Sequence, residues 1–423
     1  MLKDCLSIFK TLYEQKGDSL ILQDYKLSFG DYILVDSNGE RVRHITVNKE
    51  LNYDLEYYNY FKGLDYLSNL ISMQKPIDNK KIIHSNNYLS FFIKKESLQN
   101  KKLTEEIIDN YYKILDNPKL KYKTPNKKNA LLIYEELENK YGKSSTEALN
   151  KNKQWIKKNI FNLLENLNLK KDKTYLKVFF YAPIEIYNQE SEKYILPNIF
   201  NNVEYNINIE GKTYGVPSNN VTLNSKKPFL LNKTRKNPVP YLIELEEALL
   251  QKKFFDLLSN KIDNNKKIIY LSEQNQFYLE EGEVLNNRFN GLFLKIEKGI
   301  EPKIVDFDII SNYNPKIKEI KIADRIISNK NDLSDIIDTV YFGNQLKKNL
   351  FKDPKEIKLT NFKFKGLLLR YRDVFANYFY KGEEAQLKNM WSKISKDIIK
   401  LSIMNGYIRN AKQQEELKNI FFN

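Results

Sequence analysis

The sequence predicts an α+β fold of several structural units, with a mixed N-terminal part, a β-rich middle and a helical C-terminal part. The 423 residues exceed the roughly 100–200 residues of a usual domain. Hydrophobic residues make up 41% and aromatic residues 13% of the chain, enough to build buried cores. Segments with alternating apolar residues and segments with helical spacing are interleaved, and helical spacing alone follows near the C-terminus.

The predicted N-terminal unit, residues 1–170, opens with a helix and a hairpin. Apolar residues recur at helical spacing over Leu2–Lys16, and Gly17 follows as a stop signal. Alternating runs over 31–36 and 43–48 then flank an Asn-Gly pair, which favours a tight turn between two strands. We expect this hairpin to begin a small sheet.

The remainder of this unit is predicted to be mainly helical. An aromatic helix is expected over 51–73, followed by a polar stretch and an apolar run over 89–93. Thr104 and Thr146 are predicted N-caps, because a hydroxyl side chain can accept a hydrogen bond from a free backbone N–H group. Lysines are concentrated in the links between the helices, which are expected over 104–115, 128–140 and 146–164.

The predicted middle unit, residues 171–331, is rich in strands, and the predicted C-terminal unit, residues 332–423, is helical. Strands are expected over 175–181, 203–209, 213–216, 266–271, 276–279, 291–296 and 303–310, the last six as three pairs. A helix over 241–261 interrupts them. Helices with wide apolar stripes are expected over 333–350, 366–380, 383–404 and 411–421.

The charge of the chain is strongly positive. Its 69 Lys and Arg residues against 54 Asp and Glu residues give a net charge of +15, which attracts polyanions such as nucleic acid. Nearly all the cations are lysines, and Asn and Ile are abundant, which is also typical of proteins from an AT-rich genome. The charge alone therefore leaves both explanations open.

Several classes of site are excluded because their residues are rare. Cys5 is the single cysteine, so neither a disulfide framework nor a thiolate zinc site can form. His44 and His84 are too few for a His-based metal cage, and no Gly-rich phosphate loop occurs, so we expect no cofactor and no metal. The chain shows neither a signal peptide nor an apolar run of about 18 residues, which predicts a cytoplasmic protein with no membrane partner.

The acid-free segment, residues 211–243, is the main candidate binding element. It contains six cations and no Asp or Glu, with prolines that favour an extended loop and Phe229 as an anchor. Lys and Arg match phosphates, whereas Asn and Thr bond to phosphates or base edges. A solvated lysine-rich loop is the alternative. The residues predicted to contact nucleic acid are Asn219, Asn220, Asn224, Lys226, Lys227, Asn232, Lys233, Thr234, Arg235 and Lys236.

Two further sets of residues are candidates. The first combines cations with amides and consists of Lys80, Lys81, Asn86 and Asn87. In the second, Arg370 and Arg372 suit phosphate or a carboxylate of a partner protein, because a guanidinium binds either in bidentate fashion. For both sets, a solvated surface explains the residues equally well.

Two alternatives to nucleic-acid recognition remain open. The first is a metal-dependent nuclease, in which Asp306 and Asp308 on one strand and Glu319 with Lys321 on the next hold a divalent cation and steady the phosphate charge. Such short patterns recur by chance in a chain this rich in charge. The second alternative is a purely structural subunit that contacts only proteins.

Several stretches together resemble the large subunit of type I-B CRISPR surveillance (Cascade) complexes. The likeness extends over most of the chain and involves no catalytic signature. The stretches are residues 1–6 (MLKDCL), Gly30–Val35 (GDYILV), 82–92 (IIHSNNYLSFF), 226–229 (KKPF), 232–236 (NKTRK) and 239–241 (VPY).

The resemblance implies a non-catalytic subunit of a crRNA-guided complex. Such a subunit recognises the protospacer-adjacent motif in duplex target DNA, aids duplex opening and recruits a helicase-nuclease, beside the crRNA and the backbone and 5′-end subunits. Many family members continue into a C-terminal bundle that resembles the separate small subunit. Residues 332–423 then correspond to the first part of that bundle, to a shortened bundle, or to a member whose bundle is supplied separately.

Overall fold

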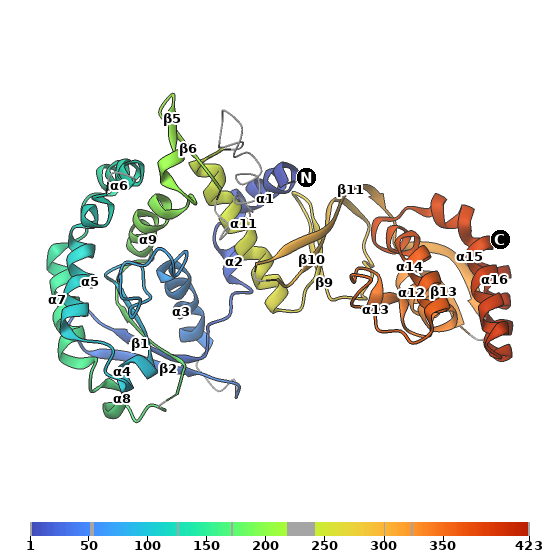
Figure 1. Cartoon of the computed structure of the whole chain (residues 1–423), viewed down its shortest axis with the longest axis horizontal. Coiled ribbons are helices and arrows are strands. Elements are labelled where there is room, and N and C mark those ends of the chain that lie inside the picture. The colour runs from blue at the N-terminus through green and yellow to red at the C-terminus, as the bar shows by residue number, and fades with distance from the viewer. Residues whose placement is uncertain are drawn as a thin grey trace. The chain divides into compact units, whose positions relative to one another are not determined.

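The computed structural model describes residues 2–50, 55–124, 127–170, 172–217, 242–299, 301–322 and 325–421 (Figure 1). Within these residues several small sheets combine with many helices, which confirms the predicted α+β class. The chain divides into two compact units. We call Asp18–Leu257 the central unit, and Met1–Gly17 together with Leu258–Asn423 the terminal unit.

The central unit is built on a four-stranded sheet with the order β2-β1-β4-β3. Its strands are β1 (Gly30–Val35), β2 (Arg41–Val47), β3 (Ser90–Lys94) and β4 (Tyr175–Phe180). β1 pairs in antiparallel fashion with β2, which confirms the predicted hairpin, and in parallel fashion with β4. Because β4 shares a sheet with β1 and β3, the predicted boundary between residues 170 and 171 lies inside this unit.

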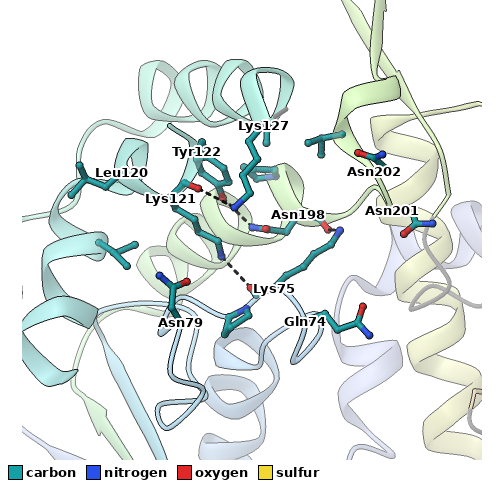
Figure 2. A pocket seen from close by; sticks show the side chains of 15 residues that line it. Gln74, Lys75, Asn79, Leu120, Lys121, Tyr122, Lys127, Asn198, Asn201 and Asn202 are labelled. Atoms are coloured by element: carbon teal, nitrogen blue, oxygen red, sulfur yellow. Dashed lines mark hydrogen bonds between the residues drawn. The ribbon is translucent and has the colours of Figure 1, made fainter. Parts of the chain in front are cut away.

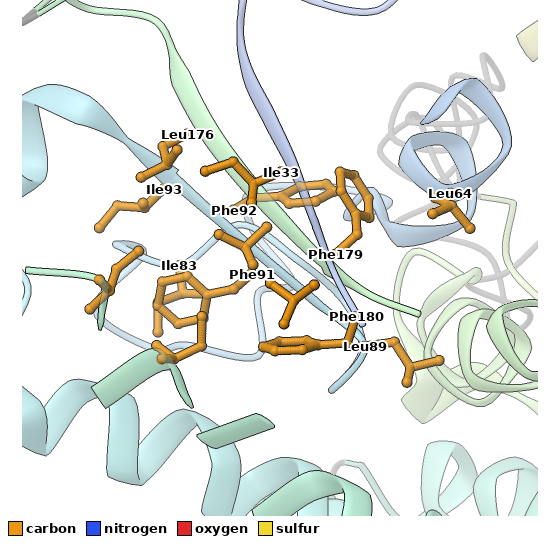
Figure 3. Packing of buried hydrophobic residues seen from close by; sticks show 14 of the residues in the cluster. Ile33, Leu64, Ile83, Leu89, Phe91, Phe92, Ile93, Leu176, Phe179 and Phe180 are labelled. Atoms are coloured by element: carbon orange, nitrogen blue, oxygen red, sulfur yellow. The ribbon is translucent and has the colours of Figure 1, made fainter. Parts of the chain in front are cut away.

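Both faces of this sheet are covered, so its strands are apolar throughout instead of alternating. Every residue of β1 is buried. On one face Phe179 packs against Phe61 of α3 (Leu55–Ser68), and on the other Phe91 packs edge-on against Tyr111 of α5 (Glu105–Asp116). Figure 3 shows Phe91 and Phe179 within this buried cluster. A side chain at Gly30 would collide with the Tyr175 carbonyl oxygen, so this close approach of β1 to β4 requires glycine.

Three of the other helices of the central unit were not predicted, namely two short helices over Ser19–Leu22 and Lys95–Gln99 and one over Ile184–Asn198. Together, the other helices are α2 (Ser19–Leu22), α4 (Lys95–Gln99), α6 (Lys128–Tyr141), α7 (Thr146–Asn159), α8 (Leu163–Asn166) and α9 (Ile184–Asn198), with 3-10 turns at Pro118–Tyr122 and Val203–Tyr205. Thr104 caps α5 as predicted. The prediction for α7 is wrong, because Ser145 caps this helix and Thr146 is its first residue.

Helix α9 is absent from the sequence prediction. Its polar residues Glu190, Lys193 and Asn198 are buried with its apolar ones, so the apolar residues do not mark a single face. Pro197 also stands within the helix, where proline is a signal for a helix end.

A small three-stranded sheet in this unit flanks the acid-free segment. Its strands are β5 (Ile207–Ile209), β6 (Lys212–Gly215) and β7 (Ile243–Glu244). β5 and β6 form the predicted hairpin. Gly215 of β6 pairs with Ile243 of β7, so the two ends of the segment are joined by strand pairing.

The terminal unit combines a second sheet with a helical layer. Its strands are β8 (Ile268–Leu271), β9 (Gln276–Leu279), β10 (Phe289–Glu297) and β11 (Lys303–Tyr313) in the order β11-β10-β8-β9, and a separate ribbon of β12 (Lys316–Ile322) and β13 (Arg325–Asn329). The predicted pairs β8 with β9 and β10 with β11 are confirmed.

Helices complete the terminal unit. They are α1 (Leu2–Lys16), the end of α11 (Leu245–Asp263), α12 (Lys330–Phe342), α13 (Leu346–Asn349), α14 (Phe362–Ala376), a π-helical turn at Asn377–Lys381, α15 (Glu384–Met404) and α16 (Ile408–Ile420). One core joins Tyr270 and Phe293 of the sheet to Leu368 and Trp391 of the helices, so the predicted boundary between residues 331 and 332 also lies inside a unit. None of the described helices has the length and apolar character needed to cross a bilayer.

Candidate nucleic-acid interface

The predicted contact residues of the acid-free segment lie outside the described residues. These are Asn219, Asn220, Asn224, Lys226, Lys227, Asn232, Lys233, Thr234, Arg235 and Lys236. The segment is described only at its two ends, up to Pro217 and from Leu242. The interface is therefore built from the described residues around those ends.

Asn86 and Asn87 are interior residues of the central unit. The Asn86 amide donates to the Leu67 and Asn69 carbonyl oxygens at 2.9 and 2.8 Å. Asn87 accepts from the Leu89 backbone N–H at 2.9 Å, and both asparagines are at most 2% exposed. These amides hold the fold together and are not offered to a ligand. Lys80 and Lys81 of the same predicted set are exposed.

Arg370 and Arg372 have different surroundings in the terminal unit. The Arg372 guanidinium donates to the Asn349 and Lys352 carbonyl oxygens at 3.1 and 2.6 Å, so it fastens α14 to the end of α13. Arg370 is exposed, and its Nη1 lies 3.9 Å from an Asp397 carboxylate oxygen. Arg370 alone remains accessible to a ligand or partner.

The four residues of the nuclease alternative belong to different sheets. Asp306 and Asp308 are on β11, whereas Glu319 and Lys321 are on the β12–β13 ribbon. Both aspartates bind the Lys381 ammonium, at 3.0 and 3.4 Å. Across the part of the chain that the structure describes, no three His, Cys, Asp or Glu residues are grouped to hold a metal ion.

A cavity of about 370 Å³ in the central unit has a cationic and polar lining (Figure 2). Lys75, Lys121 and Lys127 contribute its charge, and no Asp or Glu occurs among the described residues that line it. Its amide side chains are Gln74, Asn79, Asn198, Asn201 and Asn202. We call this site the lysine cavity.

Three separate segments bring the lysines together. Lys75 lies in the link after α3, Lys121 in the 3-10 turn after α5, and Lys127 directly before α6. The Lys75 ammonium donates to the Asn198 carbonyl oxygen at 2.6 Å and also to that of Phe200. Lys121 donates to the Lys75 carbonyl oxygen at 3.0 Å, and Lys127 to that of Lys121 at 3.3 Å. Each ammonium is therefore held by a neutral acceptor.

Uncompensated positive charge distinguishes this cavity. None of the three ammonium groups pairs with a carboxylate among the described residues. Burial lowers the pKa of Lys75 to about 8. Burial, together with the charges of Lys127 and Lys75, lowers the pKa of Lys121 to about 7. A bound anion would supply the missing countercharge, and the surrounding amides would bond to its oxygens or to base edges.

The lysine cavity lies beside the start of the acid-free segment. Asn201 lines the cavity, and its backbone N–H donates to the Val216 carbonyl oxygen at 2.9 Å. Val216 directly follows β6, at the point where the segment leaves the small sheet. This backbone hydrogen bond places a lining residue of the cavity directly beside the described start of the segment.

Sequence reasoning missed the three lysines of the cavity. Lys75 and Lys121 are separated by 46 positions in the sequence, so no local motif contains both of them. The concentration of lysines in the links between helices was the one available signal, and it applies to Lys121 and Lys127. Comparison with protein-family models, with curated proteins and with solved structures found no match.

Proposed function

We propose that this chain binds nucleic acid as a non-catalytic subunit of a crRNA-guided complex. The observation that carries the proposal is the lysine cavity beside the acid-free segment. Its three ammonium groups have no carboxylate partner in the described part of the chain, and two of them are half-buried. Buried cations without countercharge are unfavourable, so a site of this kind is completed by an anion.

The burial of Lys75 and Lys121 separates this proposal from a composition bias. A lysine-rich genome adds lysines mainly at surface positions, where the ammonium stays hydrated. It does not account for lysines that lie in a cavity with depressed pKa values, which are a feature of functional sites.

A polynucleotide fits the site better than a small anion. Gln74, Asn79 and Asn202 of the lining are exposed and can bond to phosphate, sugar and base edges, whereas a small anion needs few of them. The Asn198 amide is buried and already donates to the Tyr122 hydroxyl and the Tyr194 carbonyl oxygen. The adjoining segment contributes six cations to the sequence, of which Lys212 is described and pairs with Glu244 at 2.8 Å. A phosphate backbone that contacts such cations releases its counterions.

The resemblance adds the specific role to this proposal. In that role the chain contacts crRNA and the duplex target DNA, recognises the protospacer-adjacent motif and recruits a helicase-nuclease. The guide RNA reads most of the sequence by base pairing, so the protein needs only a few base contacts and a positively charged path for the backbone. No described lining residue of the cavity is a histidine, cysteine or carboxylate, which suits binding without catalysis.

The test compares two double variants of equal charge. Lys121→Gln with Lys127→Gln removes two cations from the cavity. Lys153→Gln with Lys157→Gln removes two cations of the same unit that pair with Asp109 at 2.8 and 3.1 Å. Affinity for single-stranded RNA and for duplex DNA is measured at several salt concentrations.

We expect the cavity variant to lose affinity and to reduce the slope of log affinity against log salt by about 1–2, since each phosphate contact contributes about 0.7–0.9. The control variant should keep the slope of the unmodified chain. Equal slopes for the two variants would contradict the proposal. No retention of either nucleic acid by the unmodified chain, alone or with its partners, would favour the purely structural alternative.

A further inference from the structure

Lys330 in the terminal unit is a buried cation whose ammonium makes no ion pair and no hydrogen bond among the described residues, although the negative charge of Glu384 in the same cavity acts on it. The residue is 5% exposed. Its ammonium nitrogen lies 4.8 Å from the ring centroids of both Tyr313 and Tyr378. Among the described residues no carboxylate oxygen and no hydrogen-bond acceptor contacts this nitrogen. The three N–H donors of the ammonium therefore lie beside two aromatic rings.

The surrounding structure holds Lys330 in this place. Asn329 caps α12 by accepting from the Asp332 backbone N–H at 2.9 Å, and the Lys330 backbone N–H donates to the Pro315 carbonyl oxygen at 2.8 Å. The Tyr313 hydroxyl donates to the Leu285 and Phe379 carbonyl oxygens at 3.0 and 2.9 Å, which fixes its ring. The position of the ammonium is thus set before any ligand binds.

A cavity of about 600 Å³ is lined by Lys330. Lys316 and Lys318 of β12 and Lys388 of α15 line it too, and Glu384 is the single carboxylate among its described lining residues. The lining therefore carries four cations and one anion. Tyr378 and Phe421 add aromatic surface beside this charge.

We propose that this cavity binds the phosphate group of an organic phosphate, with the Lys330 ammonium as its buried ligand. A phosphate oxygen supplies both the negative charge and the hydrogen-bond acceptors that the ammonium lacks. The lysines at the opening contact the remaining oxygens. The cavity volume falls within the range of about 300–1,000 Å³ found for small-ligand sites, and its aromatic wall suits a base or another flat organic group.

The organic phosphate has two possible sources, a free nucleotide and a phosphate within a polynucleotide. Both present the same oxygens to Lys330. The site consists of residues of the terminal unit only, and the lysine cavity of residues of the central unit only, so neither proposal depends on the other.

The test measures binding of three probes to the full chain by titration calorimetry: inorganic phosphate, adenosine monophosphate and a short single-stranded oligonucleotide. The background is Lys121→Gln with Lys127→Gln, which removes two of the three ammonium groups of the lysine cavity. In this background Lys330→Met removes the buried ammonium and keeps a flexible side chain between the two rings. Lys388→Gln removes a cation at the opening. Lys396→Gln, an exposed lysine of the same helix outside the cavity lining, is the matched control.

We expect Lys330→Met to weaken binding of adenosine monophosphate or the oligonucleotide at least tenfold, with an unchanged or higher Tm. Lys388→Gln should weaken it a few-fold, and Lys396→Gln should not change it. Binding of the mononucleotide identifies a free nucleotide as the ligand, and binding of the oligonucleotide alone identifies a polynucleotide. The proposal is overturned if no probe binds at millimolar concentration, or if Lys330→Met and Lys388→Gln both bind like the control. If Lys330→Met does not fold, Lys388→Gln against Lys396→Gln decides the outcome.

Discussion

At the scale of single residues, the position of a lysine says more about function than the number of lysines does. Burial lowers the pKa of Lys75 and of Lys330 to about 8, and each lines a cavity. An ammonium group loses strong hydration when it is buried, and folding must recover that loss elsewhere. Lys75 donates to neutral carbonyl oxygens, and the Lys330 ammonium lies beside two aromatic rings, with Glu384 as the one carboxylate among the described lining residues of its cavity. The loss is therefore recovered only in part before an anion binds.

The depressed pKa of Lys121 predicts opposite effects of pH on binding and on stability. Between pH 6 and 8 the folded chain releases the proton near pH 7, so affinity for nucleic acid at the lysine cavity should fall as pH rises. The unfolded chain keeps this proton up to the ordinary lysine pKa of 10.5. The free energy of unfolding should therefore rise as pH increases above 7. Binding titrations and urea denaturation at pH 6, 7 and 8 measure the two effects.

Lys121→Met serves as the control for this pH dependence. It should raise the free energy of unfolding at pH 6 by about 1–2 kcal/mol, because a half-buried charge is replaced by an apolar chain. It should also reduce both pH dependences, leaving the contribution of Lys75. A variant that is less stable than the unmodified chain at pH 6 would show that Lys121 serves the fold more than a ligand.

We expect Asn87→Ala to lower the stability of the fold without a specific loss of nucleic-acid binding. The Asn87 amide donates to the Asn86 side-chain oxygen at 2.7 Å, and its oxygen accepts from the Leu89 backbone N–H at 2.9 Å. Removing these bonds leaves buried polar groups unpaired, so we expect the free energy of unfolding to fall by about 2–3 kcal/mol. Chemical denaturation measures this change, with the exposed Lys80→Gln as a control expected within about 0.5 kcal/mol of the unmodified chain.

At the scale of secondary-structure elements, prediction succeeded where one physical signal dominated. Helix α1 was predicted with its observed bounds, because its apolar residues keep a regular spacing and Gly17, at φ +57°, ends it. The β1–β2 hairpin followed from its Asn-Gly turn. Helix α9 was missed because buried polar residues interrupt its apolar pattern.

The candidate site was less predictable than the elements that carry it. Asn86 and Asn87 were predicted to contact nucleic acid because amides beside lysines suit that role, but the same amides also satisfy buried backbone groups. The lysine cavity forms from three segments that only the folded chain brings together. The spacing of residues in the sequence does not predict which distant segments will form a shared cavity.

The acid-free segment is expected to contribute cations to the binding of target DNA. Its ends are joined by the pairing of Gly215 with Ile243, and its start adjoins the lysine cavity. Lys233→Ala with Arg235→Ala should weaken binding of target DNA and reduce the salt slope by about 1–2, because two cations that can neutralise phosphates are removed. Filter-binding assays over a range of salt concentrations measure the slope. An unchanged affinity and slope would remove the segment from the interface.

At the scale of the whole chain, each of the two compact units has its own cationic cavity. The lysine cavity lies in the central unit and the Lys330 cavity in the terminal unit. The net charge of +15 is therefore accompanied by two separate places at which anions are expected. A chain that serves as a subunit of a nucleoprotein complex can use such sites on different parts of one polyanion.

The division into two units also predicts that a core substitution in one unit destabilises mainly that unit. The terminal unit is discontinuous in sequence, because α1 belongs with residues 258–423. Phe9 of α1 is fully buried, so Phe9→Ala should lower the free energy of unfolding of the terminal unit by about 3–5 kcal/mol. Hydrogen-exchange mass spectrometry should then show faster exchange in α1 and in β8 to β11, with little change in β1 and β4 of the central unit.

Phe179→Ala, which removes a fully buried ring from the central core, should give the reverse pattern. If both variants accelerate exchange equally in both sheets, the units unfold as one, and a ligand bound in either cavity would stabilise the entire chain.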